Sequence, residues 1–151
     1  MDVVKETEVA VPPEEVYKYL LDFRKHSEWT NPGHIVRITP KSDGPTVVGS
    51  AFDSEGHQFG AQQDRLEVTE LVPNRKIVYE ATMKNGQRFR HTLEMAVIGD
   101  GATRLSKRFQ TLKLSLSSNM LAPVVARLII PKALTGDLQR MKANLERTLL
   151  R

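Results

Sequence analysis

The C-terminal segment 120–150 decides the fold, and it reads MLAPVVARLIIPKALTGDLQRMKANLERTLL. Its apolar residues recur at helical spacing and fall close to one stripe. The members of this stripe are Leu121, Val124, Leu128, Leu134, Leu138, Met141, Leu145 and Leu149. Pro131 interrupts the segment but leaves the stripe in phase, so the sequence predicts one long helix kinked at this proline. At 1.5 Å per residue the helix is ~45 Å long, enough to cross a sheet of this chain's size.

The middle of the chain has the pattern of strands separated by turns. Apolar and polar residues alternate there, and Gly, Pro, Asn and Asp interrupt them repeatedly. With the N-terminal stretch included, the predicted strands are 3–11, 35–40, 47–55, 59–71, 76–84, 87–98 and 103–114. Asn85-Gly86 joins two of them and favours a type I′ hairpin turn, which needs positive φ at both positions. Clean alternation within 87–98 indicates that one face of the sheet is covered and the other faces water.

A helix start follows the first predicted strand. Pro13 occupies a position where a missing amide is harmless, and Glu14 and Glu15 favour the positive end of a helix. A second short helix or turn is predicted over 24–29. The predicted fold is therefore α+β in a single domain over 1–151: a curved antiparallel sheet of about seven strands, with two short helices after the first strand. The terminal helix must cover this sheet, and a helix laid across a strongly curved sheet leaves an internal cavity.

Composition narrows the class of protein. The 151 residues suit one domain, and 40% hydrophobic and 26% charged residues indicate a globular chain rather than a disordered one. The absence of cysteine excludes disulfides and thiolate chemistry, and it fits a reducing compartment. No apolar run approaches the ~20 residues of a membrane span, and the N-terminus lacks the apolar core of a signal peptide. We therefore expect a cytoplasmic monomer or homodimer without a transmembrane segment.

Charge and motifs argue against several kinds of site. The net charge is +4, but the basic residues are scattered and no nucleic-acid-binding motif accompanies them. No P-loop or Gly-x-Gly-x-x-Gly sequence is present, and the four histidines lack the spacing of metal ligands. No Gly-x-Ser-x-Gly sequence surrounds a serine. We expect no nucleic-acid partner, no bound metal and no cofactor.

Four groups of residues, in this order along the chain, resemble one known family. They are Ala10-Val11-Pro12-Pro13-Glu14-Glu15-Val16-Tyr17 with Leu20, Asp22 and Trp29; Val68-Thr69-Glu70 with Pro73 and Val78; His91-Thr92-Leu93-Glu94 with Gly101-Ala102-Thr103-Arg104-Leu105; and Leu138-Gln139-Arg140-Met141-Lys142 with Glu146. The family is that of the polyketide cyclases/dehydrases and lipid-transport proteins, in the START-like, birch-pollen-allergen-like (SRPBCC) superfamily. The resemblance spans essentially the whole chain and implies a helix-grip fold with an internal cavity. It implies no single reaction, because members range from lipid and hormone carriers to aromatase/cyclases.

Residues on the covered face of the sheet are the candidates for contacting an apolar ligand. Strand parity places His91 beside Phe89 and Leu93, and it places Tyr79 on the covered face of the preceding strand. The predicted ligand contacts are Trp29, Tyr79, Phe89, His91, Leu93, Phe109 and Leu128. His91 and Tyr79 are also the candidates for catalysis, because a histidine can protonate a ligand carbonyl or hydroxyl. The alternative for His91 is a buried histidine that is hydrogen-bonded to a neighbour.

Two other residues have two interpretations each. Lys107 either faces inward beside Phe109, where it needs a carboxylate partner or a ligand anion, or extends to the rim of the cavity. We expect the rim. Trp29 either belongs to the core or forms part of a lid at the cavity entrance, and the core is the simpler interpretation.

The remaining charged and titratable residues of interest give weaker signals. Parity alone does not decide whether Glu6 and Glu8 face the cavity or water. His26, His34 and His57 lie in or near predicted loops, and we expect all three to face water.

Three functions fit these features. The first is binding or carriage of an apolar small molecule or lipid, which needs only a lined cavity with a few polar groups. The second is a polyketide aromatase/cyclase or dehydratase, which needs a general acid or base in the cavity. The third is a regulatory or chaperone-assisting interaction domain, which would have an exposed apolar patch on the outer sheet face. The first is favoured, so the protein is expected to be a carrier more than an enzyme.

Overall fold

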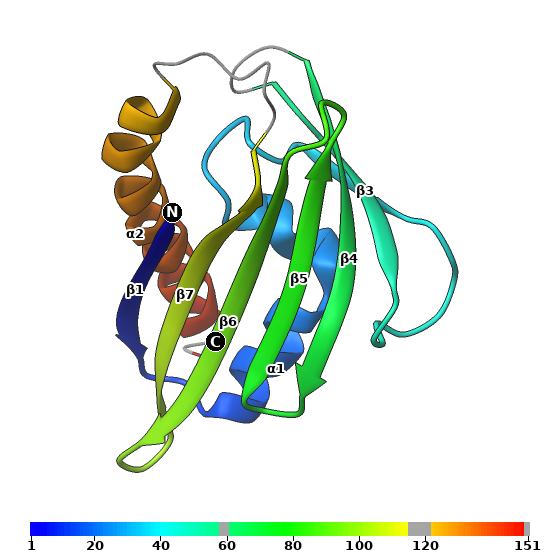
Figure 1. The fold of residues 1–151 in the computed structure, drawn as a ribbon. Coiled ribbons are helices and arrows are strands. Elements are labelled where there is room, and N and C mark those ends of the chain that lie inside the picture. The colour runs from blue at the N-terminus through cyan, green and yellow to red at the C-terminus, as the bar shows by residue number, and fades with distance from the viewer. Residues whose placement is uncertain (58–60, 115–121, 150–151) are drawn as a thin grey trace.

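The computed structural model describes residues 1–57, 61–114 and 122–149. The elements follow in the order β1 (Asp2–Val9), α1 (Pro13–Leu21), η1 (Phe23–Glu28, a 3-10 helix), β2 (Arg37–Pro40), β3 (Ala51–Gly56), β4 (Gln62–Val72), β5 (Lys76–Met83), β6 (Arg88–Ile98), β7 (Ala102–Lys113) and α2 (Ala122–Leu149). The strands form one antiparallel sheet in the order β1-β7-β6-β5-β4-β3-β2. Figure 1 shows α1 and α2 behind the same face of this sheet. The predicted α+β helix-grip architecture is therefore confirmed.

The core lies between the inner face of the sheet and the helices. Alternate residues of the central strands point into it, as the period-two pattern predicts. The largest fully buried side chains include Trp29, Phe23, Leu20, Ile77, Leu93, Leu105, Leu138 and Met141. No helix of the described residues is long and apolar enough to cross a membrane.

The hairpin between β5 and β6 forms where the sequence places it, but its turn type differs from the prediction. Gly86 has φ of 89°, whereas Asn85 is not among the residues with positive φ. The Gly86 amide donates to the Met83 carbonyl at 3.0 Å, and the Met83 amide donates to the Gln87 carbonyl. This is the geometry of a type I turn followed by a glycine in the left-handed region, so the predicted type I′ turn is wrong.

Helix α2 continues through Pro131, which confirms one long helix in place of two, but its apolar stripe is buried over only part of its length. Leu134, Leu138, Met141 and Leu145 are buried, whereas Leu128 is 69% exposed. The helix packs against β1 and β7, and Figure 1 shows its first turns rising past the start of β1. The side chains of Leu121, Val124 and Leu149 lie outside the described residues.

One close backbone approach positions the loop between η1 and β2. A Cβ atom on Gly56 would lie 2.0 Å from the carbonyl oxygen of His34, so only glycine fits at this point of β3. The His57 amide donates to the Gly33 carbonyl at 2.8 Å and fastens the same loop. His34 is thereby held over the edge of the sheet instead of extending freely into water.

Candidate ligand-binding site

A row of rings crosses the inner face of the central strands. The register pairs Tyr79 with His91 and His91 with Phe109. The Tyr79 and His91 rings stack with centroids 4.8 Å apart and planes 9° apart, and Phe109 meets His91 edge-on at 5.4 Å. Phe89 extends the row by stacking on Phe109 at 5.1 Å. Tyr79 and Phe109 are buried, whereas Phe89 and His91 are only half-buried, so the row runs from the core to a partly open end.

A second group of rings joins this row from η1. His26 stacks on Phe23 at 4.2 Å and meets Tyr79 edge-on at 5.6 Å. His26 is fully buried, and its Nε2 donates to the Leu20 carbonyl at 2.8 Å. The expectation that His26 faces water is therefore wrong. It lies three residues after Phe23, so both side chains occupy the side of η1 that packs on the sheet.

Lys107 is turned into the interior and not toward the rim. Its Nζ lies 2.7 Å from Asp137 Oδ2 on α2, and the two side chains are 4% and 7% exposed. The same Nζ lies 4.8 Å from the centroid of the Trp29 ring, a cation–π contact. The expected rim position is wrong. The alternative, an inward lysine with a carboxylate partner, is what the structure contains, because α2 supplies that carboxylate from its buried stripe.

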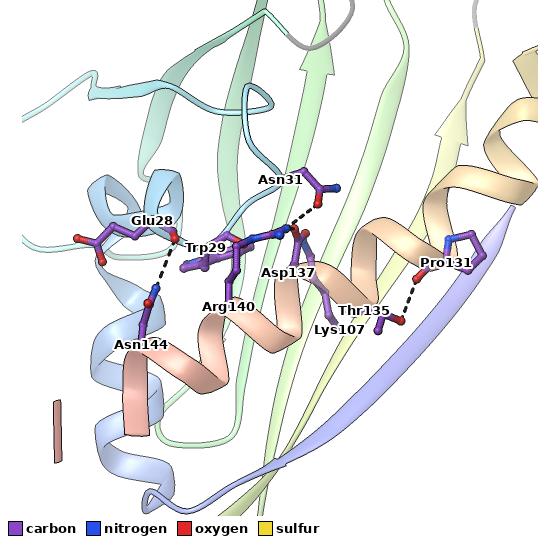
Figure 2. Close-up of polar contacts among 9 residues, drawn as sticks. All are labelled: Glu28, Trp29, Asn31, Lys107, Pro131, Thr135, Asp137, Arg140 and Asn144. Carbon is purple, nitrogen blue, oxygen red and sulfur yellow. Dashed lines mark hydrogen bonds and ion pairs between the residues drawn. The ribbon is translucent and has the colours of Figure 1, made fainter. Parts of the chain in front are cut away.

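Arg140 of α2 connects this ion pair to the end of η1. Its guanidinium donates to Asp137 Oδ1 at 2.9 Å, to Asn31 Oδ1 at 2.6 Å and to the Trp29 carbonyl at 2.8 Å. Figure 2 shows these groups meeting between α2 and the chain that leaves η1. One turn further along α2, Asn144 donates to the Glu28 carbonyl at 3.4 Å (Figure 2). A cation and an amide thus satisfy carbonyls left free where η1 ends.

The electrostatics of this interior keep its histidines neutral. Burial, opposed by the Leu20 hydrogen bond and aided by the charge of Lys107, lowers the pKa of His26 to about 3. Burial and then the charges of Lys107, His34 and His26 lower the pKa of His91 well below its usual value. Burial and Lys107 also lower the pKa of His34, against the opposing influence of Asp137. The expectation that His34 faces water is wrong, because it is partly buried, whereas His57 is exposed.

The other predicted contacts are not all in one place. Leu93 is fully buried beside the ring row, and Trp29 is fully buried in the core. Leu128 lies on α2 and is 69% exposed, so it is not part of the buried interior. The Nδ1 atom of His91 is buried and has no hydrogen-bond partner among the described residues. Glu6 and Glu8 are exposed on β1, which answers the question that parity left open.

Asp64 is a further inward-facing acid that the sequence analysis missed. On β4 it shares parity with buried Leu66 and Val68, and Gln62 donates to its Oδ2 at 3.2 Å. Its Oδ1 is buried without a partner in the described part of the chain. Burial raises the pKa of Asp64 to about 6, although the Gln62 hydrogen bond acts in the opposite direction.

Asp137 and Arg140 were also missed, although a signal for Asp137 was present. Asp137 lies three residues after Leu134 and four before Met141, so it falls inside the apolar stripe of the predicted helix. Lys107 alternates with Leu105 and Phe109 in the same way on β7. Opposite charges within two apolar faces that must pack together indicate a buried ion pair. No sequence pattern marks Arg140, whose role depends on the end of η1.

Comparisons with known proteins agree with this architecture. An aromatase/cyclase, Zhui, from a Streptomyces species superposes with a TM-score of 0.78 at 15% identity, over 99% of this chain and 95% of that one. A START superfamily protein from Mycobacterium smegmatis superposes with a TM-score of 0.73 at 16% identity, over 97% and 98%. At such identities the likeness concerns the fold alone. No curated protein matches the sequence. The family model described as polyketide cyclase/dehydrase and lipid transport matches residues 1–149, and this chain therefore belongs to that family.

Proposed function

We propose that the protein binds an apolar, ring-containing small molecule on the inner face of β5, β6 and β7 and acts as a carrier. The observation that supports this most directly is the row of rings Tyr79, His91, Phe109 and Phe89, in which two contacts are stacked and one is edge-on. Flat rings in offset stacks offer large apolar area at fixed geometry, and Phe89 and His91 keep part of that area uncovered. A planar apolar ligand would extend the row at its half-buried end.

Around the ring row, the electrostatics favour binding over catalysis by His91. A general acid or base works best with a pKa near the working pH. The pKa of His91 is instead lowered well below neutrality by burial and by Lys107. Lys107 itself is held in an ion pair with Asp137. Both groups can orient a ligand by hydrogen bonds, but His91 is poorly matched to moving a proton at neutral pH.

The outer face of the sheet argues against the interaction-domain alternative. Charged pairs lie along it in the described residues, among them Glu80 with Arg90 and Arg108 with Asp2. A contiguous apolar patch is what a docking face would need.

A neutral fluorescent probe, N-phenylnaphthylamine, tests the proposal. We expect saturable binding near one to one by the folded protein, with Phe89→Leu weakening it. His91→Gln should lower the affinity by less than about tenfold, because one neutral hydrogen bond is worth ~0.5–1.5 kcal/mol. Glu94→Gln, on the outer face of the same strand, is the matched control and should change nothing. Absence of probe binding by the folded wild-type protein would overturn the proposal.

The cyclase/dehydratase alternative makes a different prediction. If the protein converts a poly-ketone substrate and His91 is its acid or base, His91→Gln should cut turnover ~10²–10⁴-fold while probe affinity survives. Such a result would replace the carrier function with an enzymatic one. If His91→Gln only unfolds the protein, His91 is structural, and the Phe89→Leu result decides whether the ring row binds.

A further inference from the structure

The polar centre of the domain contains more positive than negative charge. Lys107, Asp137 and Arg140 form what we call the cationic cluster: two bases that share one carboxylate. The Lys107 and Asp137 side chains are 4% and 7% exposed, and that of Arg140 is 33% exposed. Asp137 can neutralise only one of the two cations, so one surplus positive charge is left on the cluster beside the buried ion pair.

No second carboxylate balances the cluster in the part of the chain that the structure describes. Asp137 is the one acid there that pairs with Lys107 or Arg140. Asp64 also faces inward, but it lies on β4, where its cross-strand neighbours are Ser54 of β3 and Met83 of β5. The positive charge of Lys107 also acts on the neighbouring histidines, because it lowers the pKa values of His26, His34 and His91.

Neighbouring residues fix the position of the Arg140 guanidinium. The Arg140 guanidinium lies against Gly136, where an added Cβ would come within 3.3 Å of Nη2, so the absence of a side chain makes room for it. Its bonds to the Trp29 carbonyl and Asn31 fix its plane. The ammonium and the guanidinium still have N–H donors beyond their bonds to described residues.

The cluster adjoins the ring row. Lys107 pairs across the strands with Leu93, two residues from His91 on β6, and lies two residues from Phe109 on β7. Lys107 and Phe89 are thus two cross-strand rows apart, or ~13 Å at 3.3 Å per residue. That span suits a body of two linked rings with a polar group at its inner end.

We propose that the cationic cluster is the subsite for a single anionic group, such as a carboxylate, on the ligand whose apolar body lies along Phe109 and Phe89. The inference rests on the binding function proposed above and adds the charge of the ligand to it. The anion supplies the missing counter-charge and accepts hydrogen bonds from Lys107 and Arg140. The ligand class is therefore a monoanionic aromatic or aliphatic acid and not a neutral lipid.

Two probes with the same rings separate this inference from the binding function. Anilinonaphthalene sulfonate has one negative charge, and N-phenylnaphthylamine has the same aromatic units without it. We expect the folded protein to bind the anionic probe about tenfold or more tightly than the neutral one, the range of a charge-assisted hydrogen bond. Binding of the neutral probe alone would leave the carrier function standing and overturn the anion subsite.

Variants that change the charge of the cluster in opposite directions sharpen the test. Arg140→Gln should lower the affinity for the anionic probe about tenfold, and Asp137→Asn should raise it by a similar factor. The affinity for the neutral probe should change by less than about twofold in both variants. Arg147→Gln, an exposed arginine on the same helix, is the matched control. Parallel changes in both probes would indicate a structural effect and contradict the subsite. If Asp137→Asn fails to fold, as shown by its melting curve, Arg140→Gln against Arg147→Gln decides alone.

Discussion

Lys107 Nζ and Asp137 Oδ2 lie 2.7 Å apart inside the protein and join strand β7 to helix α2. Both residues lie on the buried, otherwise apolar face of their element. Lys107 lies between Leu105 and Phe109 on the strand, and Asp137 lies between Leu134 and Leu138 on the helix. The pair therefore fixes how the helix sits along the sheet, because sliding either element would leave a charge buried without its partner.

The first prediction concerns this pair. Asp137→Leu leaves the buried Lys107 without a carboxylate partner and should destabilise the protein by about 3–5 kcal/mol. The double variant Lys107→Met/Asp137→Leu should recover most of that loss, since apolar residues of similar volume commonly replace a buried pair at little cost. Urea unfolding of the three proteins measures both effects. A double variant as unstable as the single one would mean that packing at these positions, rather than charge pairing, sets the stability.

The second prediction concerns the apolar stripe of α2. Leu138→Ala and Leu145→Ala should each lower the free energy of unfolding by about 2–5 kcal/mol, because both side chains are buried and truncation leaves a cavity. Leu128→Ala is the matched control on the same helix and should stay within about 0.5 kcal/mol, as that side chain is 69% exposed. Equal losses at all three positions would show that the first half of α2 is covered in solution.

The third prediction concerns the hairpin. Gly86 has φ of 89°, and an added Cβ would meet no atom within 4 Å, so any penalty for a side chain comes from the backbone alone. Gly86→Val should cost about 1–3 kcal/mol, since a β-branched residue resists positive φ. Lys84→Val, in the same turn but exposed, should change the melting temperature little. A melting temperature for Gly86→Val that matches this control would argue against the left-handed glycine.

The fourth prediction concerns pH. Burial raises the pKa of Asp64 from 3.8 to about 6 in the folded protein. The contribution of Asp64 to the free energy of unfolding is therefore fully present below pH ~3.8, and it is lost as the pH rises through about 6. Asp64→Asn removes this loss. The variant should therefore gain stability relative to wild type between about pH 4.5 and pH 7.5, by ~1–2 kcal/mol after allowance for solvent screening of a half-buried group.

Urea unfolding at the two pH values measures this difference. Asp53→Asn, an exposed carboxylate on β3 paired with Lys41, is the control. A gain for Asp64→Asn that does not change with pH would mean that the Asp64 carboxyl is ionised throughout and that the effect has another source.

The sequence by itself determined the elements and the inner face of the central strands. Period-two alternation placed Tyr79, Phe89, His91 and Phe109 on one face, because strand geometry alone assigns alternate residues to opposite sides. Helical spacing likewise identified the stripe of α2 to which the buried Leu134, Leu138, Met141 and Leu145 belong. These are local rules, and they need no knowledge of what packs against the element.

Only the tertiary structure decided which partner each polar residue meets. His26 is buried because η1 folds back onto the sheet, and Lys107 is paired because α2 crosses β7 where Asp137 projects. Arg140 donates a hydrogen bond to the Trp29 carbonyl at the end of η1, more than a hundred residues away in the sequence. Leu128 belongs to the same apolar stripe as Leu134 and Leu138, yet it is 69% exposed. Such contacts depend on the relative placement of distant segments, and the periodicity of one segment contains no information about that placement.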